Sequence, residues 1–309
     1  MRALVFKRYG GLDQVVFADL PRPVPKPDEI LVQVHAAGLN PVENKIRSGK
    51  MKAILRFQLP ATLGSDLAGV VVEVGGSVTR FKPGDAVFAS IDGLRMGALA
   101  ELAVVTENAA ALKPAHLDFV QAASIPMVGL TAWQTLKERA HIKPGHKVFI
   151  PAGAGGIGTF AIQLAKYLGA KVATTTSAGN VDLVRSLGAD EVIDYQKQNF
   201  EVLASDIDLI VDLVGGQVLD KSWSVLSPSG VLASIAATDV VSRAPAGRHG
   251  IWLSVKPDTA RLATIAQEIA DGSLRSTISE VVGFDDLASA IERNRTGHAP
   301  GKIVLDLTR

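Results

Sequence analysis

Glycine is concentrated in one short stretch of the chain, although it is a costly residue to order on folding. In VFIPAGAGGIG, which ends at Gly158, Gly153, Gly155 and Gly158 have the spacing G-x-G-x-x-G. The residues before these glycines are apolar, as in a buried strand, and those after them have the apolar periodicity of a helix. In such a βαβ unit, backbone N–H groups and the positive dipole end at the start of the helix bind a pyrophosphate.

The sequence therefore predicts a dinucleotide site at this turn. Its expected contacts are Gly153, Ala154, Gly155, Gly156, Ile157 and Gly158. The alternative is a tight strand–helix turn in an unrelated α/β protein.

The segment after the second predicted strand indicates which dinucleotide is bound. NAD sites usually carry an acidic residue about 20 residues after the glycines, where it bonds the ribose 2′-hydroxyl. TTTSAGN, residues 174–180, has no acidic residue, and the first one downstream is Asp182. Its small hydroxyl side chains leave room for a 2′-phosphate, which Ser177 can bond, although the segment also lacks Arg and Lys. We expect NADP, with NADPH as the reduced form, and NAD is the alternative.

A second segment, NPVENKIRSG, has the residue types of a short helix. Asn40 suits the N-cap, Pro41 suits the first helical position, and Glu43 completes a capping box. These preferences explain the three residues without any chemistry. Lys45 belongs to the same helix, and its ammonium can donate a hydrogen bond to a carbonyl oxygen on which negative charge develops. The alternative for Lys45 is an ordinary lysine in contact with water.

One apparent catalytic motif is rejected. YLGAK matches the Y-x-x-x-K pair of short-chain dehydrogenases, in which both side chains lie on one face of a helix. Gly169 stands between Tyr167 and Lys171 and has the position of a helix-ending glycine, so the two side chains are expected on different elements.

Composition excludes several classes of function. The chain has no cysteine, which excludes disulfides, cysteine-ligated zinc, iron–sulfur clusters and thiolate nucleophiles. Its six histidines form no HExxH motif, and no metal site is predicted. With 32 basic and 31 acidic residues, it shows no charge pattern typical of nucleic-acid binding. We found neither a secretory signal nor a membrane-spanning run, and we expect a cytoplasmic location.

The order of the predicted elements indicates two domains. The first third is β-rich, with apolar segments such as EILVQVHAAGL and AGVVVEVGG between glycines and prolines. A helical pattern begins at Phe119, and strands and helices then alternate, including expected helices over 157–168 and near 218–226. That alternation predicts a doubly wound parallel sheet, hence an α/β protein. The expected boundaries are 1–124 for the β domain, 125–255 for the dinucleotide domain and 256–309 for a segment returning to the first domain.

Nearly the whole chain resembles the medium-chain dehydrogenase/reductase superfamily, and it is most similar to the zinc-less quinone oxidoreductase branch, which includes ζ-crystallin and plant enone oxidoreductases. Seven segments carry the likeness in the family's order: AAGLNPVENKIRSG, LGSDLAGVVVEVG, FKPGDAVFA, AASIPMVGLTAW, KPGHKVFIPAGAGGIG, LVRSLGADEVIDY and HAPGKIVLDL. The resemblance implies a chaperonin-10-like (GroES-like) β domain, a Rossmann domain and a cleft between them. Zinc-dependent members have catalytic metal ligands in the regions matching Asn40, Ser65 and Asp66 and in the segment before Thr131, whereas this chain resembles the zinc-free members.

The resemblance also assigns candidate roles. It implies that Asn40 and Lys45 face the nicotinamide or the substrate, and that Thr131 contacts the nicotinamide end. The resemblance also places Tyr195 beside the adenosine phosphate and Lys302 near the cofactor. Val214 and Gly215 are expected contacts because they follow a predicted strand at the carboxyl end of the sheet, where ligands gather in such folds, and Ala236 and Ala237 follow the next strand and are expected to frame the nicotinamide. Three of these residues have ordinary structural alternatives: Thr131 can bond its own helix, Tyr195 can cover a sheet edge, and Lys302 can neutralise the surface.

The expected activity is transfer of a hydride from NADPH to a quinone or an α,β-unsaturated carbonyl, without zinc. An enoyl-thioester reductase of the same fold and a non-catalytic NADP-binding sensor or scaffold are the alternatives. We also expect a homodimer, because relatives commonly pair through edge strands of the Rossmann sheet and IWLSV is apolar enough for such an edge.

Overall fold

The structure is a computed structural model of residues 1–309, and it describes all of them except 92–94 and 298. The chain forms two compact units. Unit 1 contains residues 1–130, 256–271 and 276–309, and unit 2 contains residues 131–255 and 272–275. Each unit has a sheet and a hydrophobic core of its own.

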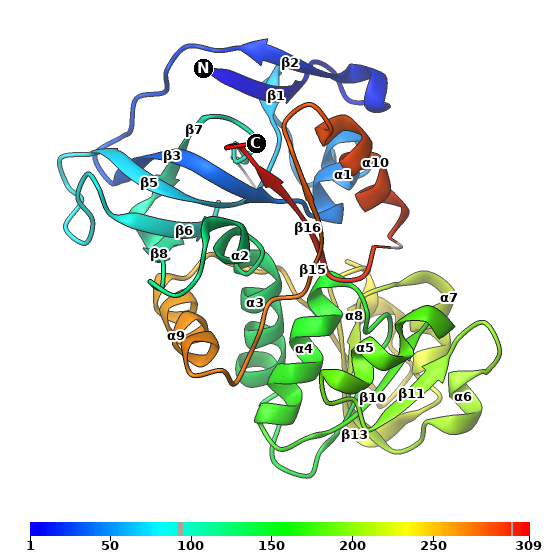
Figure 1. The fold of residues 1–309 in the computed structure, drawn as a ribbon. Coiled ribbons are helices and arrows are strands. Elements are labelled where there is room, and N and C mark those ends of the chain that lie inside the picture. The colour runs from blue at the N-terminus through cyan, green and yellow to red at the C-terminus, as the bar shows by residue number, and fades with distance from the viewer. Residues whose placement is uncertain (92–94, 298) are drawn as a thin grey trace. The chain divides into compact units, whose positions relative to one another are not determined.

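Unit 2 is built on a six-stranded sheet in the order β11-β10-β9-β12-β13-β14, and all of its neighbouring strands are parallel (Figure 1). Numbered along the chain, this is the order 3-2-1-4-5-6 of a dinucleotide-binding Rossmann sheet. The predicted doubly wound parallel sheet is thereby confirmed. Its strands are β9 (Lys147–Ile150), β10 (Lys171–Thr176), β11 (Glu191–Asp194), β12 (Ile207–Asp212), β13 (Leu226–Ser234) and β14 (His249–Trp252).

Apolar helix faces pack on this sheet around a core that includes Phe149, Ile210 and Leu232. The helices of unit 2 are α4 (Gly156–Tyr167), the 3-10 turn η4 (Ala178–Asn180), α5 (Val181–Ser186), α6 (Phe200–Leu203), α7 (Gly216–Ser222) and α8 (Val240–Arg243). The helix expected near 218–226 ends earlier, because Leu226 already begins β13. Strand β14 begins two residues before the expected IWLSV segment and already ends at Trp252.

Unit 1 contains a seven-stranded sheet and a smaller one. The larger follows the order β15-β16-β3-β5-β6-β8, with β7 also paired to β3, and the smaller has the order β2-β1-β4. The strands are β1 (Arg2–Phe6), β2 (Val15–Asp19), β3 (Glu29–Gly38), β4 (Ala61–Thr62), β5 (Asp66–Val74), β6 (Ala86–Ser90), β7 (Leu102–Thr106), β8 (Ala110–Leu112), β15 (Ile278–Val282) and β16 (Lys302–Asp306).

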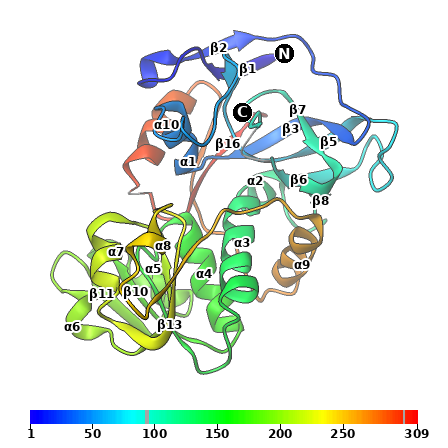
Figure 2. The same cartoon turned by 180° about the vertical axis from the view of Figure 1, so that it is seen from behind.

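The helices of unit 1 come from both ends of the chain. They are η1 (Leu12–Gln14), α1 (Pro41–Arg47), η2 (Glu107–Ala109), α2 (Phe119–Ala123), α9 (Thr259–Ala270) and α10 (Leu287–Thr296). Helices α1 and α10 lie side by side, as Figure 2 shows. The predicted helical segment after Phe119 is split at Pro126: α3 (Pro126–Trp133) begins there and continues into a π-helical turn, η3 (Gln134–Arg139).

The C-terminal segment completes the sheet of unit 1. Strand β16 pairs antiparallel with β3, so that Val304 stands opposite Gly38. Between α9 and β15 the chain passes through unit 2, where Gln163 of α4 both donates to and accepts from the backbone of Arg275, at 3.0 Å each. Among the described residues, no helix has the length and apolar character needed to cross a bilayer.

Candidate functional site

The predicted glycine turn joins β9 to α4, and its three glycines differ in what surrounds them. A Cβ on Gly153 would lie 2.0 Å from Thr174 Oγ1, and a Cβ on Gly158 would lie 2.5 Å from the Ala152 carbonyl oxygen. A Cβ on Gly155 would meet nothing closer than 3.4 Å. Gly153 and Gly158 are thus required by packing, whereas Gly155 faces open space.

The first turn of α4 has free hydrogen-bond donors. Gly155 is the N-cap, and its carbonyl accepts from Thr159 N–H at 2.9 Å. The N–H groups of Gly156, Ile157 and Gly158 have no acceptor among the described residues. Three unpaired N–H groups at the positive end of a twelve-residue helix form a site for an anion such as a pyrophosphate.

Ser177 and Tyr195 follow the carboxyl ends of two neighbouring strands. Thr176 of β10 pairs with Asp194 of β11, and Tyr195 N–H donates to the Thr176 carbonyl at 3.2 Å. The Ser177 hydroxyl accepts from Asn180 Nδ2 at 3.2 Å, and the Tyr195 ring is half exposed. The structure therefore brings these two predicted adenosine contacts together at one edge of the sheet.

The loops after β12 and β13 hold four more of the predicted contacts, and two buried polar residues brace them. Asp212 accepts from Val214 N–H at 3.1 Å and from Gly215 N–H at 2.8 Å. The Ser234 hydroxyl donates to Asp212 at 2.6 Å and accepts from the N–H groups of Ala236 and Ala237. Sequence reasoning missed Ser234. The sequence signal that could have indicated Ser234 is a small hydroxyl residue at the end of a predicted strand, on the same sheet edge as Asp212.

Thr131 lies on α3, and its side chain is buried. Its carbonyl accepts from the Thr135 hydroxyl at 2.7 Å, a local helix bond of the kind that Ser and Thr often make. The π-helical turn begins three residues later, at Gln134, and such turns are frequent at functional sites. The predicted contact of Thr131 with the nicotinamide end stays a prediction.

In unit 1, α1 begins as the sequence predicts. Asn40 is the N-cap, Pro41 follows, and the Glu43 carboxylate accepts from Asn40 N–H at 3.4 Å. Lys45 is exposed, and none of the described residues forms an ion pair with its ammonium. Lys45 is therefore free to act as a hydrogen-bond donor to a ligand.

The Asn40 side chain belongs to a buried polar cluster, which we define as Asn40, Glu43, Asp66 and Lys302. Asn40 Nδ2 donates to Asp66 Oδ2 at 3.0 Å, and Asn40 Oδ1 accepts from Lys302 Nζ at 2.6 Å. Asp66 also accepts from Met127 N–H at 3.0 Å, and Glu43 from Ser65 N–H at 2.9 Å. The amide of Asn40 is thus occupied on both sides by other members of the cluster.

Burial controls the titration of the two carboxyls. It raises the pKa of Glu43 to about 7, with the opposing charge of Lys302 lowering it and the like charge of Asp66 raising it further. Burial likewise raises the pKa of Asp66, against the opposing effect of Lys302 and Asn40. Asp66 accepts from the Lys302 ammonium and from two further N–H donors, those of Asn40 Nδ2 and Met127, so we place the proton of this pair on Glu43.

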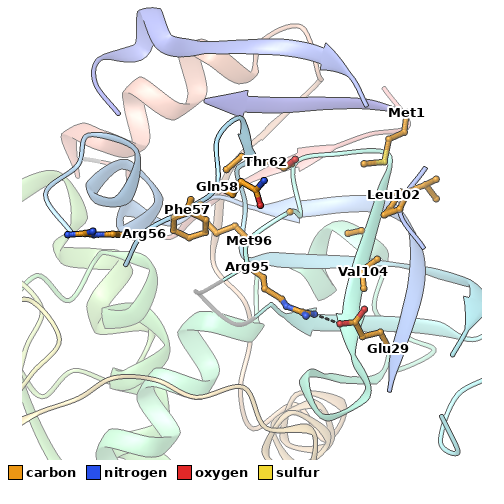
Figure 3. A pocket seen from close by; sticks show the side chains of 14 residues that line it. Met1, Glu29, Arg56, Phe57, Gln58, Thr62, Arg95, Met96, Leu102 and Val104 are labelled. Atoms are coloured by element: carbon orange, nitrogen blue, oxygen red, sulfur yellow. Dashed lines mark hydrogen bonds and ion pairs between the residues drawn. The ribbon is translucent and has the colours of Figure 1, made fainter. Parts of the chain in front are cut away.

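Unit 1 also has a cavity of about 470 Å³ that none of the predicted site residues lines. Arg95 and the buried Glu29 form an ion pair within it, and Phe57 and Met96 also line this cavity (Figure 3). Burial raises the pKa of Glu29, but the hydrogen bonds and charges of Arg95 and Lys26 outweigh that effect and lower it overall. The cavity is therefore polar on this side, and the charge of Glu29 is compensated by Arg95.

Family models match both parts of the chain. Residues 26–115 match the alcohol dehydrogenase GroES-like domain, and residues 187–305 match zinc-binding dehydrogenase. Among curated proteins, the chain is 37% identical to the chloroplastic NADPH-dependent alkenal/one oxidoreductase of Arabidopsis thaliana, covering 99% of this chain and 79% of that protein. It is 34% identical to the mitochondrial NAD(P)H oxidoreductase RTN4IP1 of Danio rerio, covering 99% and 91%.

A solved structure agrees with these matches over the full length. The quinone oxidoreductase from Coxiella burnetii superimposes with a TM-score of 0.93 at 33% identity, covering 99% of both chains. The description of the second family model mentions zinc, but the residues of this chain do not fit a zinc site. The described residues contain no group of three or more His, Cys, Asp or Glu that could hold a metal ion. The oxygens of Leu39, Asn40 and Asp66 are already bonded by Lys302, so they do not fit a zinc ion.

Proposed function

The chain belongs to the medium-chain dehydrogenase/reductase superfamily, and from that membership we infer that it is an NADPH-dependent oxidoreductase acting on quinones or α,β-unsaturated carbonyls. The observation that carries the cofactor assignment is the set of unpaired N–H groups at Gly156, Ile157 and Gly158. The names of the relatives, alkenal/one oxidoreductase and quinone oxidoreductase, support the substrate class.

We assign the cofactor to the carboxyl edge of the unit 2 sheet. The first turn of α4 would bind the pyrophosphate, and the hydroxyls of Ser177 and Tyr195 would bind the adenosine phosphate. The loops braced by Asp212 and Ser234 would frame the nicotinamide end through Val214, Gly215, Ala236 and Ala237. When bound, NADPH supplies the hydride, and the protein supplies orientation and polar contacts.

Lys45 is the proposed catalytic residue of unit 1. A carbonyl oxygen that gains negative charge during hydride transfer needs a hydrogen-bond donor, and Lys45 is a free one. Asn40, the other predicted catalytic residue, has its amide occupied within the cluster, so we give it a supporting position beside Lys45. Quinones and enones accept a hydride more readily than simple ketones, so one ammonium donor suits this substrate class.

We propose that the reaction does not use zinc, because the oxygens of Asn40 and Asp66, which lie in the regions that match the zinc ligands of zinc-dependent members, are bonded by Lys302. A cytoplasmic location also remains a proposal, since the two curated relatives carry mitochondrial and chloroplastic names. Fractionation of cells expressing the tagged protein tests the location.

The activity is tested by mixing the protein with NADPH and a panel of quinones, enones, enals and acyl-CoA thioesters, while following the absorbance of the cofactor. Consumption with quinones or enones supports the proposal. Consumption restricted to acyl-CoA substrates would identify an enoyl-thioester reductase, and tight NADPH binding without any turnover would identify a sensor or scaffold.

Lys45 has its own test in the same assay. We expect Lys45→Met to lower kcat roughly 100-fold, because one donor to the developing charge is lost. Binding of NADPH, measured by fluorescence titration, is expected to be unchanged. Lys45→Arg retains a donor and should keep a larger share of the activity. A Lys45→Met variant with normal kcat would remove this residue from the proposal.

A further inference from the structure

The ammonium of Lys302 lies at the centre of the buried cluster and is completely satisfied there. The side chain is 4% exposed. Its Nζ donates to the Leu39 carbonyl at 2.9 Å, to Asn40 Oδ1 at 2.6 Å and to Asp66 Oδ2 at 3.3 Å. An ammonium has three N–H donors, so none is left for a ligand.

The fold makes room for this side chain. A Cβ on Gly38 would lie 3.3 Å from Lys302 Cε and 2.5 Å from the Ala123 carbonyl oxygen, so only glycine leaves the path of the lysine stem open. The backbone is held as well, because Lys302 N–H donates to the Thr277 carbonyl at 2.8 Å. Strand β16 therefore holds the Lys302 ammonium beside the carboxyl end of β3 and the start of β5.

The charges of the cluster require such a cation. Asp66 is fully buried and Glu43 nearly so, and a buried carboxylate without a counter charge is strongly destabilising. Of the charged groups that face the two carboxyls, Lys302 is the positive one. The oxygens around its Nζ are also the donor type that hard divalent cations prefer, but a second cation at the same oxygens would be repelled by the ammonium.

We propose that the Lys302 ammonium is the resident cation of this site, in the place that the resemblance to zinc-dependent members suggests for a metal ion. By holding Leu39, Asn40 and Asp66 together, it fixes the start of α1 and so positions Lys45. Lys302 is then a positioning residue. The positioning of Lys45 rests on the proposed function, whereas the assignment of Lys302 as the resident cation does not.

A double-mutant cycle tests the charge pairing. Lys302→Met removes the charge at similar length, and Asp66→Asn removes the carboxylate charge. Lys113→Met is a control at a lysine whose ammonium donates to the backbone carbonyls of Pro114 and Leu117, lies over the Phe119 ring and forms no ion pair with a described residue. We expect Lys302→Met to lower Tm more than Lys113→Met does, and the double variant Lys302→Met/Asp66→Asn to recover part of that loss. Losses that simply add would overturn the pairing.

The activity of the same double variant separates positioning from general stability. We expect its kcat to stay roughly 10- to 100-fold low, because small displacements of a reacting group are costly, while KM for NADPH changes little. If kcat recovered together with Tm, the positioning role would be wrong. If the wild type reduced no conjugated carbonyl or quinone, the proposed function would fail, and the Tm cycle would still decide the cation assignment.

A third measurement needs no variant. Crystals of the wild-type protein soaked in Zn²⁺ are expected to show no anomalous peak within the cluster. A peak bonded to Asn40 Oδ1 and Asp66 Oδ2, with Lys302 displaced, would overturn the proposal.

Discussion

At the scale of single residues, Glu43 and Asp66 share one buried counter charge, and that sharing makes the stability of unit 1 depend on pH. The pKa of Glu43 is raised from 4.5 to about 7 in the folded protein. The folded state therefore binds more protons than the unfolded state between these values, and stability falls as the pH rises through that window. The contribution of the protonated form is fully present below pH 4.5 and is lost above pH 7.

We predict that Glu43→Gln, which keeps the shape of the protonated acid, removes this pH dependence. Relative to the variant, the wild type should lose on the order of 3 kcal/mol of unfolding free energy between pH 4.5 and pH 8. Urea unfolding at the two pH values measures the difference. Glu191→Gln, at an exposed glutamate, is the control and should follow the wild type. Parallel pH curves for the wild type and Glu43→Gln would show that Glu43 is ionised throughout.

We also propose that selectivity for NADPH depends on one residue, Ser177. Ser177→Asp places a carboxylate where we expect the 2′-phosphate, so it should repel NADPH and accept the ribose hydroxyl of NADH. We predict an NADPH Kd raised about tenfold or more in a fluorescence titration, with NADH binding retained. Ser177→Ala controls for the lost hydroxyl. Tighter binding of NADH than of NADPH by the wild type would contradict the cofactor assignment itself.

The sequence predicted some of these residues well and others poorly. Gly153, Gly155 and Gly158 are recognisable because their spacing is local and has a direct physical cause. The partners of Asn40 and Lys302 are not, because 262 positions separate them and nothing near Lys302 shows that its ammonium is buried. A single lysine in a strand end is compatible with a cofactor contact, a surface charge or an internal cation, and only the fold distinguishes them.

At the scale of elements, the turn between β9 and α4 combines two tasks in one short segment. Gly153 and Gly158 allow β10 and α4 to pack closely, and Gly155 leaves the helix start open. These tasks can be separated, because the space around the three glycines differs.

We predict that Gly155→Ala folds normally but binds NADPH poorly, since its methyl group has room in the protein and projects toward the expected phosphates. Gly153→Ala should instead lower Tm strongly, because its methyl group would lie 2.0 Å from Thr174 Oγ1. Thermal unfolding and NADPH titration of both variants provide the test. An unchanged NADPH Kd in Gly155→Ala would argue against pyrophosphate binding at this turn.

Short elements were the part of the fold that sequence patterns did not predict. The long segments of β3 and β5, and the strands of the parallel sheet, are found because they are apolar runs bounded by glycines, prolines or predicted helices. Strands β4 and β8 contain two and three residues, so they show no period, and they exist because neighbouring strands supply their hydrogen bonds. Helix α7 ends before the predicted residue 226 for a similar reason, because Leu226 pairs with Ile207 of β12 and so belongs to β13.

At the scale of the whole molecule, β14 is an edge strand of the unit 2 sheet, and among the strands that the structure describes it pairs with β13 alone. Trp252 on this strand is 37% exposed, and the neighbouring helix α8 exposes Val241. We propose that two copies of the chain associate here, because an uncovered edge strand otherwise invites uncontrolled pairing.

Sedimentation of the wild type should show a species of twice the 32.5 kDa chain mass. Trp252→Glu should convert that species to a monomer by placing a charge in an apolar interface. Val202→Glu, at an 81% exposed valine on α6, is the matched control and should remain dimeric. A wild type that sediments only as a 32.5 kDa species would contradict the dimer.

The pairing of β16 with β3 has a consequence for biosynthesis. As the ribosome releases the polypeptide from its N-terminus, residues 131–255 can fold while translation continues. Strand β3 can pair early with β5 and β7, but its third partner, β16, lies more than 260 positions downstream. Until Lys302 leaves the ribosome, Asp66 and Glu43 lack the positive charge that compensates their burial. The first domain to be synthesised is thus the last to be completed, and during that delay its unfinished sheet is the segment of the nascent protein most in need of a chaperone.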